Sequence, residues 1–161
     1  ACLVGSEMCI RDRLRGIYDY GKPFKREAPG SNKAYGFCIP PRKDSSTVAV
    51  FEAAIDAMAE MTLCGSMANK WRLSLGGISA SEKEPPALQE FLQQHPEIRT
   101  IELRLDNDSP GRMASAHIQK IYADHYQMLD LPPCLEGGDY ADVAKNNLMA
   151  RTAAHRAAAC R

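Results

Sequence analysis

The sequence predicts an α/β fold, built on a parallel sheet of about four strands with flanking helices. Three observations support this prediction. From Thr47 onwards, short runs of strand length alternate with longer segments of helical period, and glycine or proline marks the junctions. A chain of 161 residues with 45% hydrophobic content can bury one core. Alternating strands and helices favour parallel strands joined by right-handed crossovers.

Four strands and four helices are expected after residue 46. The first strand, residues 48–51, is a continuous apolar run of the kind that is buried on both faces of a sheet. The other strands are expected over residues 70–75, 101–105 and 126–131. The helices are expected over residues 53–63, 85–96, 110–125 and 141–151.

Helical periodicity also predicts which side chains pack inward. In the first helix the inward stripe is expected to be Ile55, Met58, Ala59 and Leu63, with Asp56 and Glu60 on a different stripe. In the third and fourth helices the inward residues are expected to be Ala114, Ile118, Ile121 and Tyr122, and then Val143 and Leu148.

Two aspartates follow the third predicted strand. Asp106 and Asp108 come after the alternating run of residues 101–105, and Pro110 then suits the first turn of a helix. Open α/β sheets bind ligands at the carboxyl ends of their strands, and paired carboxylates there suit a Mg²⁺ that brings phosphates with it. The same segment is also a good turn and N-cap sequence, so this motif alone leaves both interpretations open.

A third carboxylate is expected at the same edge of the sheet. Glu52 directly follows the first strand, and the carboxyl ends of parallel strands lie together. The second strand ends in Gly76-Gly77, which leaves space for a bulky ligand. Because like charges repel, carboxylates converge only where a cation or bound protons compensate them. Glu52, Asp106 and Asp108 together therefore favour a metal site.

The net charge of zero conceals an asymmetry along the chain. Residues 14–43 contain seven basic and two acidic residues, a net charge of +5. Aromatic residues are interleaved with these cations: Tyr18, Tyr20, Phe24, Tyr35 and Phe37. Such a segment can stack bases and contact phosphates, or its aromatics can cover an edge of the following domain.

The domain organisation is predicted from these shifts in composition. Residues 1–13 resemble a translated sequencing adaptor and are expected to be a non-native artefact. Residues 14–46 form a basic, turn-rich segment, interpreted as the remnant of an upstream domain. Residues 47–150 form the α/β domain, and the alanine-rich residues 151–161 are a tail, either a frayed helix or a truncation scar.

Other functional classes are disfavoured by what the sequence lacks. The six cysteines include no CxxC pair and the four histidines supply no zinc spacing, so no zinc site is expected. The chain shows neither an apolar run of membrane-spanning length nor a signal-peptide pattern, which predicts no membrane association and a cytoplasmic location.

These motifs resemble those of Toprim domains, the Rossmann-like catalytic domains of bacterial-type primases, topoisomerases and certain nucleases. Residues 51–56 (FEAAID) resemble the glutamate motif after the first strand, residues 75–77 (LGG) the glycine turn, and residues 105–111 (LDNDSPG) the Asp-x-Asp motif. Residues 138–142 (GDYAD) resemble the late Lys-Asp-x-Asn element of primase-like members, with Gly138 and Asp142 departing from it. The segment before the domain resembles an uncharacterised domain that precedes Toprim in proteins of mobile elements.

The resemblance implies a primase-like enzyme of a mobile element. Asp106 and Asp108, with or without Glu52, would hold one or two Mg²⁺, or Mn²⁺, while Glu52 alternatively serves as general acid or base. Asp56 would support this site or simply lie on the helix surface, and Arg112 would meet a phosphate or be an ordinary exposed arginine. The implied partners are DNA, in particular single-stranded DNA, nucleotides and a replicative helicase.

Two rival functions stay open at this stage. A Toprim nuclease would use the same acids with water as the nucleophile. A non-catalytic nucleic-acid-binding module would keep the basic segment for binding, with a vestigial acidic edge. Topoisomerase activity is disfavoured because the chain has no room for a separate domain carrying a tyrosine nucleophile.

Overall fold

The computed structural model describes residues 13–15, 25–27, 32–65, 68–78 and 84–159. At its centre is a five-stranded sheet in the order β3-β5-β4-β6-β7. The strands are β3 (Cys38–Ile39), β4 (Thr47–Phe51), β5 (Trp71–Ser74), β6 (Thr100–Leu103) and β7 (Gln127–Asp130). The last four are parallel, and β3 pairs with β5 in the antiparallel sense. The predicted α/β class is confirmed, with one short antiparallel edge strand added.

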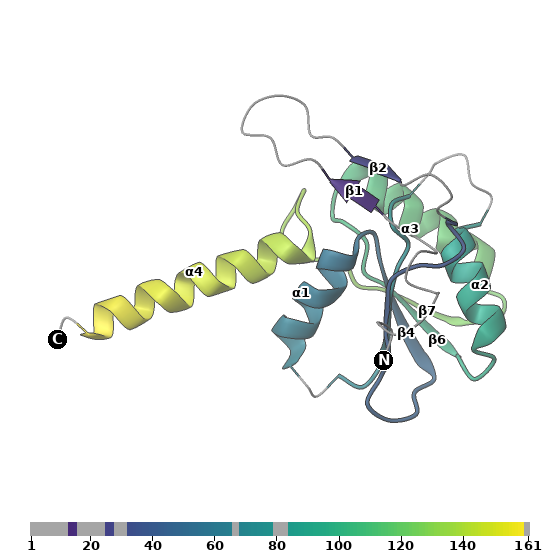
Figure 1. The fold of residues 1–161 in the computed structure, drawn as a ribbon, viewed down its shortest axis with the longest axis horizontal. Coiled ribbons are helices and arrows are strands. Elements are labelled where there is room, and N and C mark those ends of the chain that lie inside the picture. The colour runs from purple at the N-terminus through teal and green to yellow at the C-terminus, as the bar shows by residue number, and fades with distance from the viewer. Residues whose placement is uncertain (1–12, 16–24, 28–31, 66–67, 79–83, 160–161) are drawn as a thin grey trace.

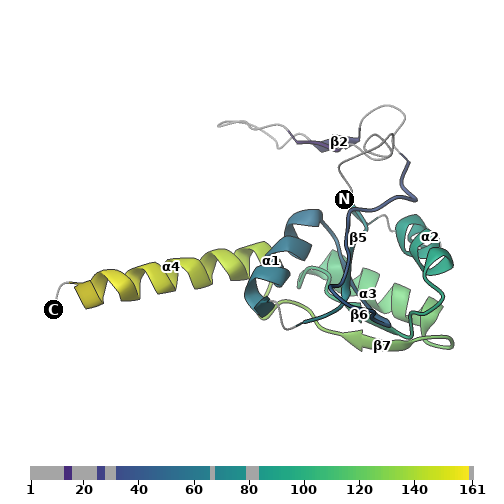
Figure 2. The ribbon, with the colours of Figure 1, turned by 60° about the horizontal axis from the view of Figure 1, so that its bottom comes forward.

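Helices cover both faces of this sheet (Figures 1 and 2). They are α1 (Ala54–Cys64), α2 (Pro86–Gln94), α3 (Ser109–Tyr122) and α4 (Tyr140–Ala159). A separate antiparallel ribbon joins β1 (Arg13–Arg15) to β2 (Lys25–Glu27). None of the helices within the described residues is long and apolar enough to span a bilayer.

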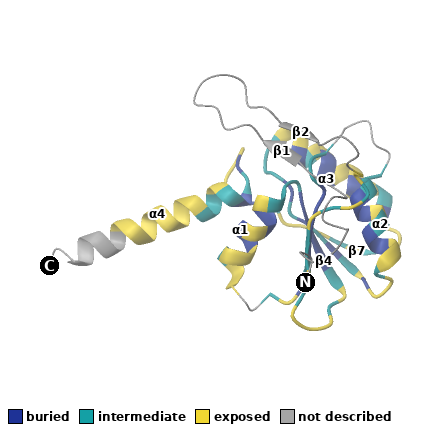
Figure 3. Cartoon of the chain, viewed as in Figure 1, coloured by how far each residue is buried: buried dark blue, intermediate teal, exposed yellow. Residues whose placement is uncertain are grey.

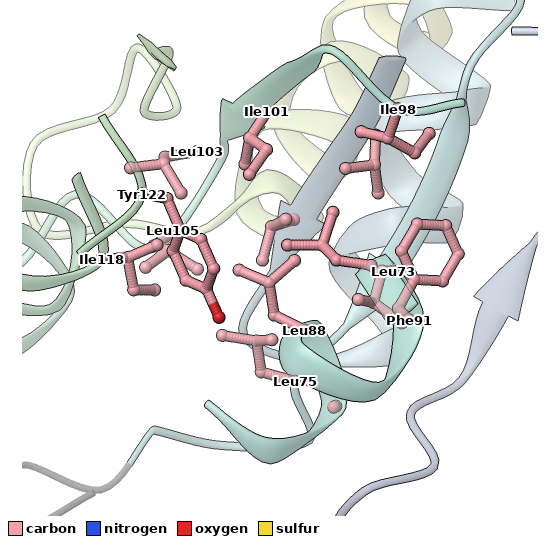
Figure 4. Close-up of a cluster of buried hydrophobic side chains, with 14 of the residues drawn as sticks. Leu73, Leu75, Leu88, Phe91, Ile98, Ile101, Leu103, Leu105, Ile118 and Tyr122 are labelled. Carbon is pink, nitrogen blue, oxygen red and sulfur yellow. The ribbon is translucent and has the colours of Figure 1, made fainter. Parts of the chain in front are cut away.

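The central strand β4 divides the interior into two cores. Its side chains alternate across the sheet, so Val48 and Val50 pack with residues of α2 and α3, whereas Ala49 and Phe51 pack with α1 and α4. The α2/α3 side holds the larger cluster, which is shown in Figure 4. Burial on both faces explains why the β4 sequence is apolar throughout.

The predicted inward stripe of α1 was only partly right: Ala59 is buried and Leu63 packs against the smaller core, but the other two residues do not. Ile55 and Met58 point outward and are 49% and 44% exposed, whereas Asp56 and Glu60 are buried at 2% and 0%. The cause lies in the sheet beneath the helix. Arg72 on β5, Glu102 on β6 and Arg104 just beyond β6 alternate with core residues. They therefore project from the α1 face of the sheet, where Glu60 forms ion pairs with both arginines. A polar sheet face selects the polar face of the helix.

The course of α4 also differs from the prediction. Its first turn packs on α1, but the helix then projects away from the sheet (Figures 1 and 3). Leu148, which we expected to be packed, is 66% exposed, while Val143 is half-buried. The helix continues through most of the predicted tail as far as Ala159.

The N-terminal segment is described only in part. Residues 1–12, which make up nearly all of the expected artefact, lie outside the described residues, as do Tyr18, Tyr20 and Phe24 of the basic segment. Tyr35 and Phe37 are described and are 41% and 45% exposed. The backbone of Phe37 lies against the edge of the sheet, where its carbonyl accepts a hydrogen bond from the Ser74 amide at 2.8 Å.

Candidate metal centre

Glu52 lies at the carboxyl end of β4, as predicted. Its carbonyl oxygen accepts hydrogen bonds from the Gly77 amide at 2.9 Å and from the Ser74 hydroxyl at 3.3 Å. Gly76 and Gly77 have φ angles of 68° and 108°, which side chains rarely allow. The glycine turn therefore bonds to the backbone of Glu52 and holds it at the end of the strand.

The Asp106–Asp108 loop joins β6 to α3. Asp108 is the N-cap of α3, and its Oδ1 accepts a hydrogen bond from the Gly111 amide at 2.8 Å. The capping interpretation is thus confirmed, and it uses only one of the two carboxylate oxygens of Asp108. Gly111 passes so close to Asp106 that a Cβ there would collide with the Asp106 carbonyl oxygen. The close packing at the start of α3 requires glycine.

Arg112 connects this loop with β7. Its Nη1 donates to both oxygens of Asp130 at 2.9 and 3.0 Å, and its Nη2 donates to the Leu105 carbonyl at 3.0 Å. Its Nε donates to the Asp106 carbonyl at 3.3 Å. Every nitrogen of the guanidinium is engaged within the fold, so the alternative of an ordinary exposed arginine was wrong, whereas the phosphate contact stays a prediction.

Two further aspartates approach the same edge. The Asn107 amide donates to the Gly138 carbonyl at 3.0 Å, and the Gly137 amide donates to the Asn107 carbonyl at 2.8 Å. This pairing brings Asp139, which immediately precedes α4, next to the Asp106 loop. Asp56 of α1 reaches the same place, because its Oδ1 accepts a hydrogen bond from the Ala141 amide at 3.3 Å. The alternative that placed Asp56 on the helix surface was therefore wrong.

The negative charges of these five carboxylates influence one another at this edge of the sheet. The pKa of Asp106 is raised from 3.8 to about 7, first by burial and then by the negative charges of Glu52, Asp56, Asp139 and Asp108. The pKa of Asp56 is raised to about 6, first by burial and then by Asp139, with a smaller contribution from Glu52. We refer to Glu52, Asp56, Asp106, Asp108 and Asp139 as the acidic edge. The ion pairs that Lys70, Arg72, Arg104 and Arg112 form among the described residues involve other carboxylates, those of Glu60, Glu102 and Asp130.

The donor set fits a hard divalent cation in its chemistry. All five side chains offer carboxylate oxygens, which are the ligands Mg²⁺ prefers, and their mutual repulsion is what a bound cation would relieve. Among the described residues, however, no three acidic, histidine or cysteine side chains lie close enough together to hold a metal as they stand. The acidic edge is therefore a concentration of suitable charge rather than a preassembled coordination shell.

Sequence reasoning identified three of these five acids as metal ligands and left out Asp139. The signal was nevertheless present, since Asp139 lies in the loop that follows β7, beyond the carboxyl end of another parallel strand. Asp56 was named as a candidate, with the helix surface as the alternative. Because the predicted inward stripe of α1 did not include Asp56, its contact with the site was not expected.

A pocket opens beside the acidic edge on the α2/α3 side of the sheet. Its volume is about 320 Å³. Glu52 and Gly77 line one end, and the apolar side chains of Leu75, Met113 and Ile118 line much of the remainder. The space that we expected beside the glycine turn is therefore present.

Comparison with known proteins identifies the family to which this architecture belongs. Residues 49–144 match the Toprim-like family, and the chain belongs to that family. A crystal structure of a DNA primase domain from Pseudomonas aeruginosa superimposes with a TM-score of 0.59 at 19% identity, a likeness that shows the shared fold. The match covers 85% of this chain and 43% of that structure, so the chain spans less than half of its length. No curated protein sequence matches significantly.

Proposed function

We propose that the chain carries the metal-dependent site of a primase-like nucleotidyl transferase that acts on DNA. The observation that supports the proposal is that Glu52, Asp106 and Asp108 lie just past the carboxyl ends of β4 and β6 in a Toprim-like sheet, with further acids near enough to act on the charge of Asp106. The structurally similar protein is a DNA primase domain, which favours nucleotide addition over the other reactions of this fold. A mobile element, a cytoplasmic location and a partner helicase belong to the same proposal.

The residues proposed to hold Mg²⁺, or Mn²⁺, are Asp106, Glu52 and the oxygen of Asp108 that does not cap α3. The cation would neutralise and orient phosphate oxygens. Asp56 and Asp139 add negative charge beside these ligands, and Asp56 also anchors the start of α4. Arg112 and Gly111 hold the backbone of Asp106 in place.

Glu52 is the proposed proton acceptor when it is not a metal ligand. In primer synthesis, a 3′-hydroxyl would lose its proton to the Glu52 carboxylate and its oxygen would bond to the α-phosphorus of the incoming nucleotide. The bond from that phosphorus to the pyrophosphate group breaks, and pyrophosphate leaves. The fixed backbone of Glu52, bonded to Gly77, would keep the carboxylate at this position.

The domain boundaries belong to the proposal as well. The family match lies inside the proposed domain of residues 47–150. Residues 14–46 are proposed to be a basic nucleic-acid-binding segment, and residues 1–13 to be non-native.

The decisive experiment is Mg²⁺-dependent primer synthesis on single-stranded DNA with nucleotides present. We expect product from the wild type and a loss of at least 100-fold in Asp106→Asn and in Glu52→Gln, as is common when a group that acts in the transition state is removed. Glu136→Gln, an exposed acid outside the acidic edge, is the matched control and should retain activity.

Two other results would redirect the assignment. Cleavage of DNA without nucleotides, lost in the same variants, would identify a nuclease that uses the same acids. Equal DNA binding by the wild type and both variants, with no turnover on any substrate, would overturn the enzymatic proposal in favour of a binding module.

A further inference from the structure

The pocket beside Glu52 is lined mainly by apolar residues, with Glu52 and His117 as its polar side chains. It opens where Asp108 leads into α3, and Pro110 at the start of that helix contributes to its wall. Its inner surface is formed by Leu75 and Ile118, which also belong to the core cluster in Figure 4. A solvent-facing hollow of this character adjoins the most strongly charged part of the domain.

One exposed side chain lies at the rim of the pocket. Met113 of α3 lines the pocket and is 65% exposed, whereas the next residue, Ala114, is buried. A flexible, polarizable thioether at the rim of an apolar pocket is well suited to contact a flat ligand. The volume of about 320 Å³ lies at the lower end of the range of small-molecule sites.

Glu52 connects the pocket with the acidic edge. It directly follows β4 at the acidic edge, and the same residue lines the pocket. A ligand that fills both places must therefore have an anionic end, brought to the carboxylates by a cation, and a flat, weakly polar end. A nucleotide has this division between its phosphates and its base.

We propose that this pocket receives the base of a nucleoside triphosphate whose phosphates lie at the acidic edge. The inference rests on the proposed function, since only a bound cation would bring phosphates to these carboxylates. The walls are formed by Leu75, Ala114 and Ile118, and Met113 covers the base from the rim. Apolar surfaces accept the faces of all four bases, so the pocket contributes affinity for a nucleotide with little preference among bases.

Binding in the presence of Mg²⁺ tests this proposal with two probes, ATP and inorganic tripolyphosphate. The two share the triphosphate and differ in the nucleoside. We expect calorimetry to show that the wild-type chain binds ATP at least tenfold more tightly than tripolyphosphate. In spectra of the protein with ¹³C-labelled methionine methyl groups, ATP should shift the Met113 resonance and tripolyphosphate should not. Met58, exposed on α1, is the internal control and should not respond to either probe.

Filling the pocket should remove the difference between the probes. Ala114→Leu adds volume to the wall, and we expect it to weaken ATP binding about tenfold while tripolyphosphate binding stays within twofold of the wild type. If circular dichroism shows that this variant is unfolded, Met113→Gln decides, because its position is exposed; it should weaken ATP binding alone. Met58→Gln is the matched control and should change neither affinity.

Each remaining outcome decides between the two proposals. Equal affinity for both probes with an unmoved Met113 resonance overturns the base pocket and leaves the metal site standing. Absence of Mg²⁺-dependent binding of either probe, or binding that Asp106→Asn leaves unchanged, overturns the proposed function and the base pocket with it.

Discussion

Helix α1 contributes one residue to each of two groups of charged side chains, and the pKa shifts of the acids in the two groups have opposite signs. Asp56 belongs to the acidic edge, where burial and like charges raise the pKa of Asp106 to about 7. Four residues further along the same face, Glu60 forms ion pairs with Lys70, Arg72 and Arg104 at 3.1, 2.6 and 3.5 Å. Burial alone would raise the pKa of Glu60, but the Arg72 hydrogen bond and Lys70 offset it and leave that pKa lowered.

The two groups differ in whether their negative charges are neutralised within the fold. Around Glu60, two acids are matched by three cations, because Glu102 also pairs with Lys70 and Arg104 at 2.6 and 2.8 Å. We call Glu60, Lys70, Arg72, Glu102 and Arg104 the buried ion network. At the acidic edge the like charges oppose one another, which costs stability in the folded chain. Mutual repulsion among carboxylates is typical of functional sites, including those that bind a cation.

The largest effect should come from breaking the buried ion network. Glu60→Gln leaves Arg72 and its neighbours buried without their shared carboxylate, and we expect the free energy of unfolding to fall by about 3–5 kcal/mol. Urea denaturation measures the change. Asp56→Asn on the same helix face keeps an oxygen for the Ala141 amide and removes a repelling charge, so it should destabilise by less than about 1 kcal/mol. Equal losses in the two variants would contradict the contrast.

The pH dependence of the free energy of unfolding should report on the acidic edge. The pKa values of Asp56 and Asp106 are about 6 and about 7 in the folded chain against 3.8 ordinarily, so between these limits the folded state binds more protons than the unfolded state. The contribution of these two groups to the free energy of unfolding should then fall as pH rises from about 4 to 7, by about 2 kcal/mol after allowance for solvent screening; Glu60, whose pKa is lowered, acts in the opposite sense at the acid end. Urea midpoints across this range measure it.

Asp106→Asn serves as the matched variant for that titration. The decline between pH 4 and 7 should become shallower, because the more strongly shifted of the two groups no longer titrates. A curve that keeps the wild-type slope in this variant would place the titrating groups elsewhere in the chain.

Magnesium should relieve part of the same penalty. At pH 8 and a Mg²⁺ concentration ten times the dissociation constant, binding to the folded chain alone adds about 1.4 kcal/mol to the free energy of unfolding. Thermal denaturation with and without Mg²⁺ measures the gain. Asp106→Asn should lose it, whereas Glu136→Gln, which changes an exposed acid, should keep it. A gain that persists in Asp106→Asn would separate the metal from the acidic edge.

The smallest effect is expected on the outer face of α1. Met58→Lys places a charge where the sequence predicts a core residue but the side chain is 44% exposed, so stability should change by no more than about 0.5 kcal/mol. A loss of 2 kcal/mol or more in urea denaturation would show that this face is covered in solution and would restore the predicted orientation of the helix.

Much of the fold was readable from local pattern. The β4 run, the proline at the start of α2 and the alternation along β6 each report a local preference, and the four parallel strands lie where these patterns predicted them. The positions of Glu52 and Asp106 also followed, because parallel strands present their carboxyl ends at one edge.

Other features depend on contacts between distant segments. The turned face of α1 results from the charged face of β5 and β6, and periodicity within the helix carries no information about the surface beneath it. The engagement of Arg112 depends on Asp130 of β7, eighteen residues further along the chain. Asp139 joins the acidic edge because the backbone of Asn107 pairs with that of Gly137 and Gly138. Local sequence thus decided which elements form and where their ends lie, whereas tertiary packing decided which charges are neutralised and which are left to face a ligand.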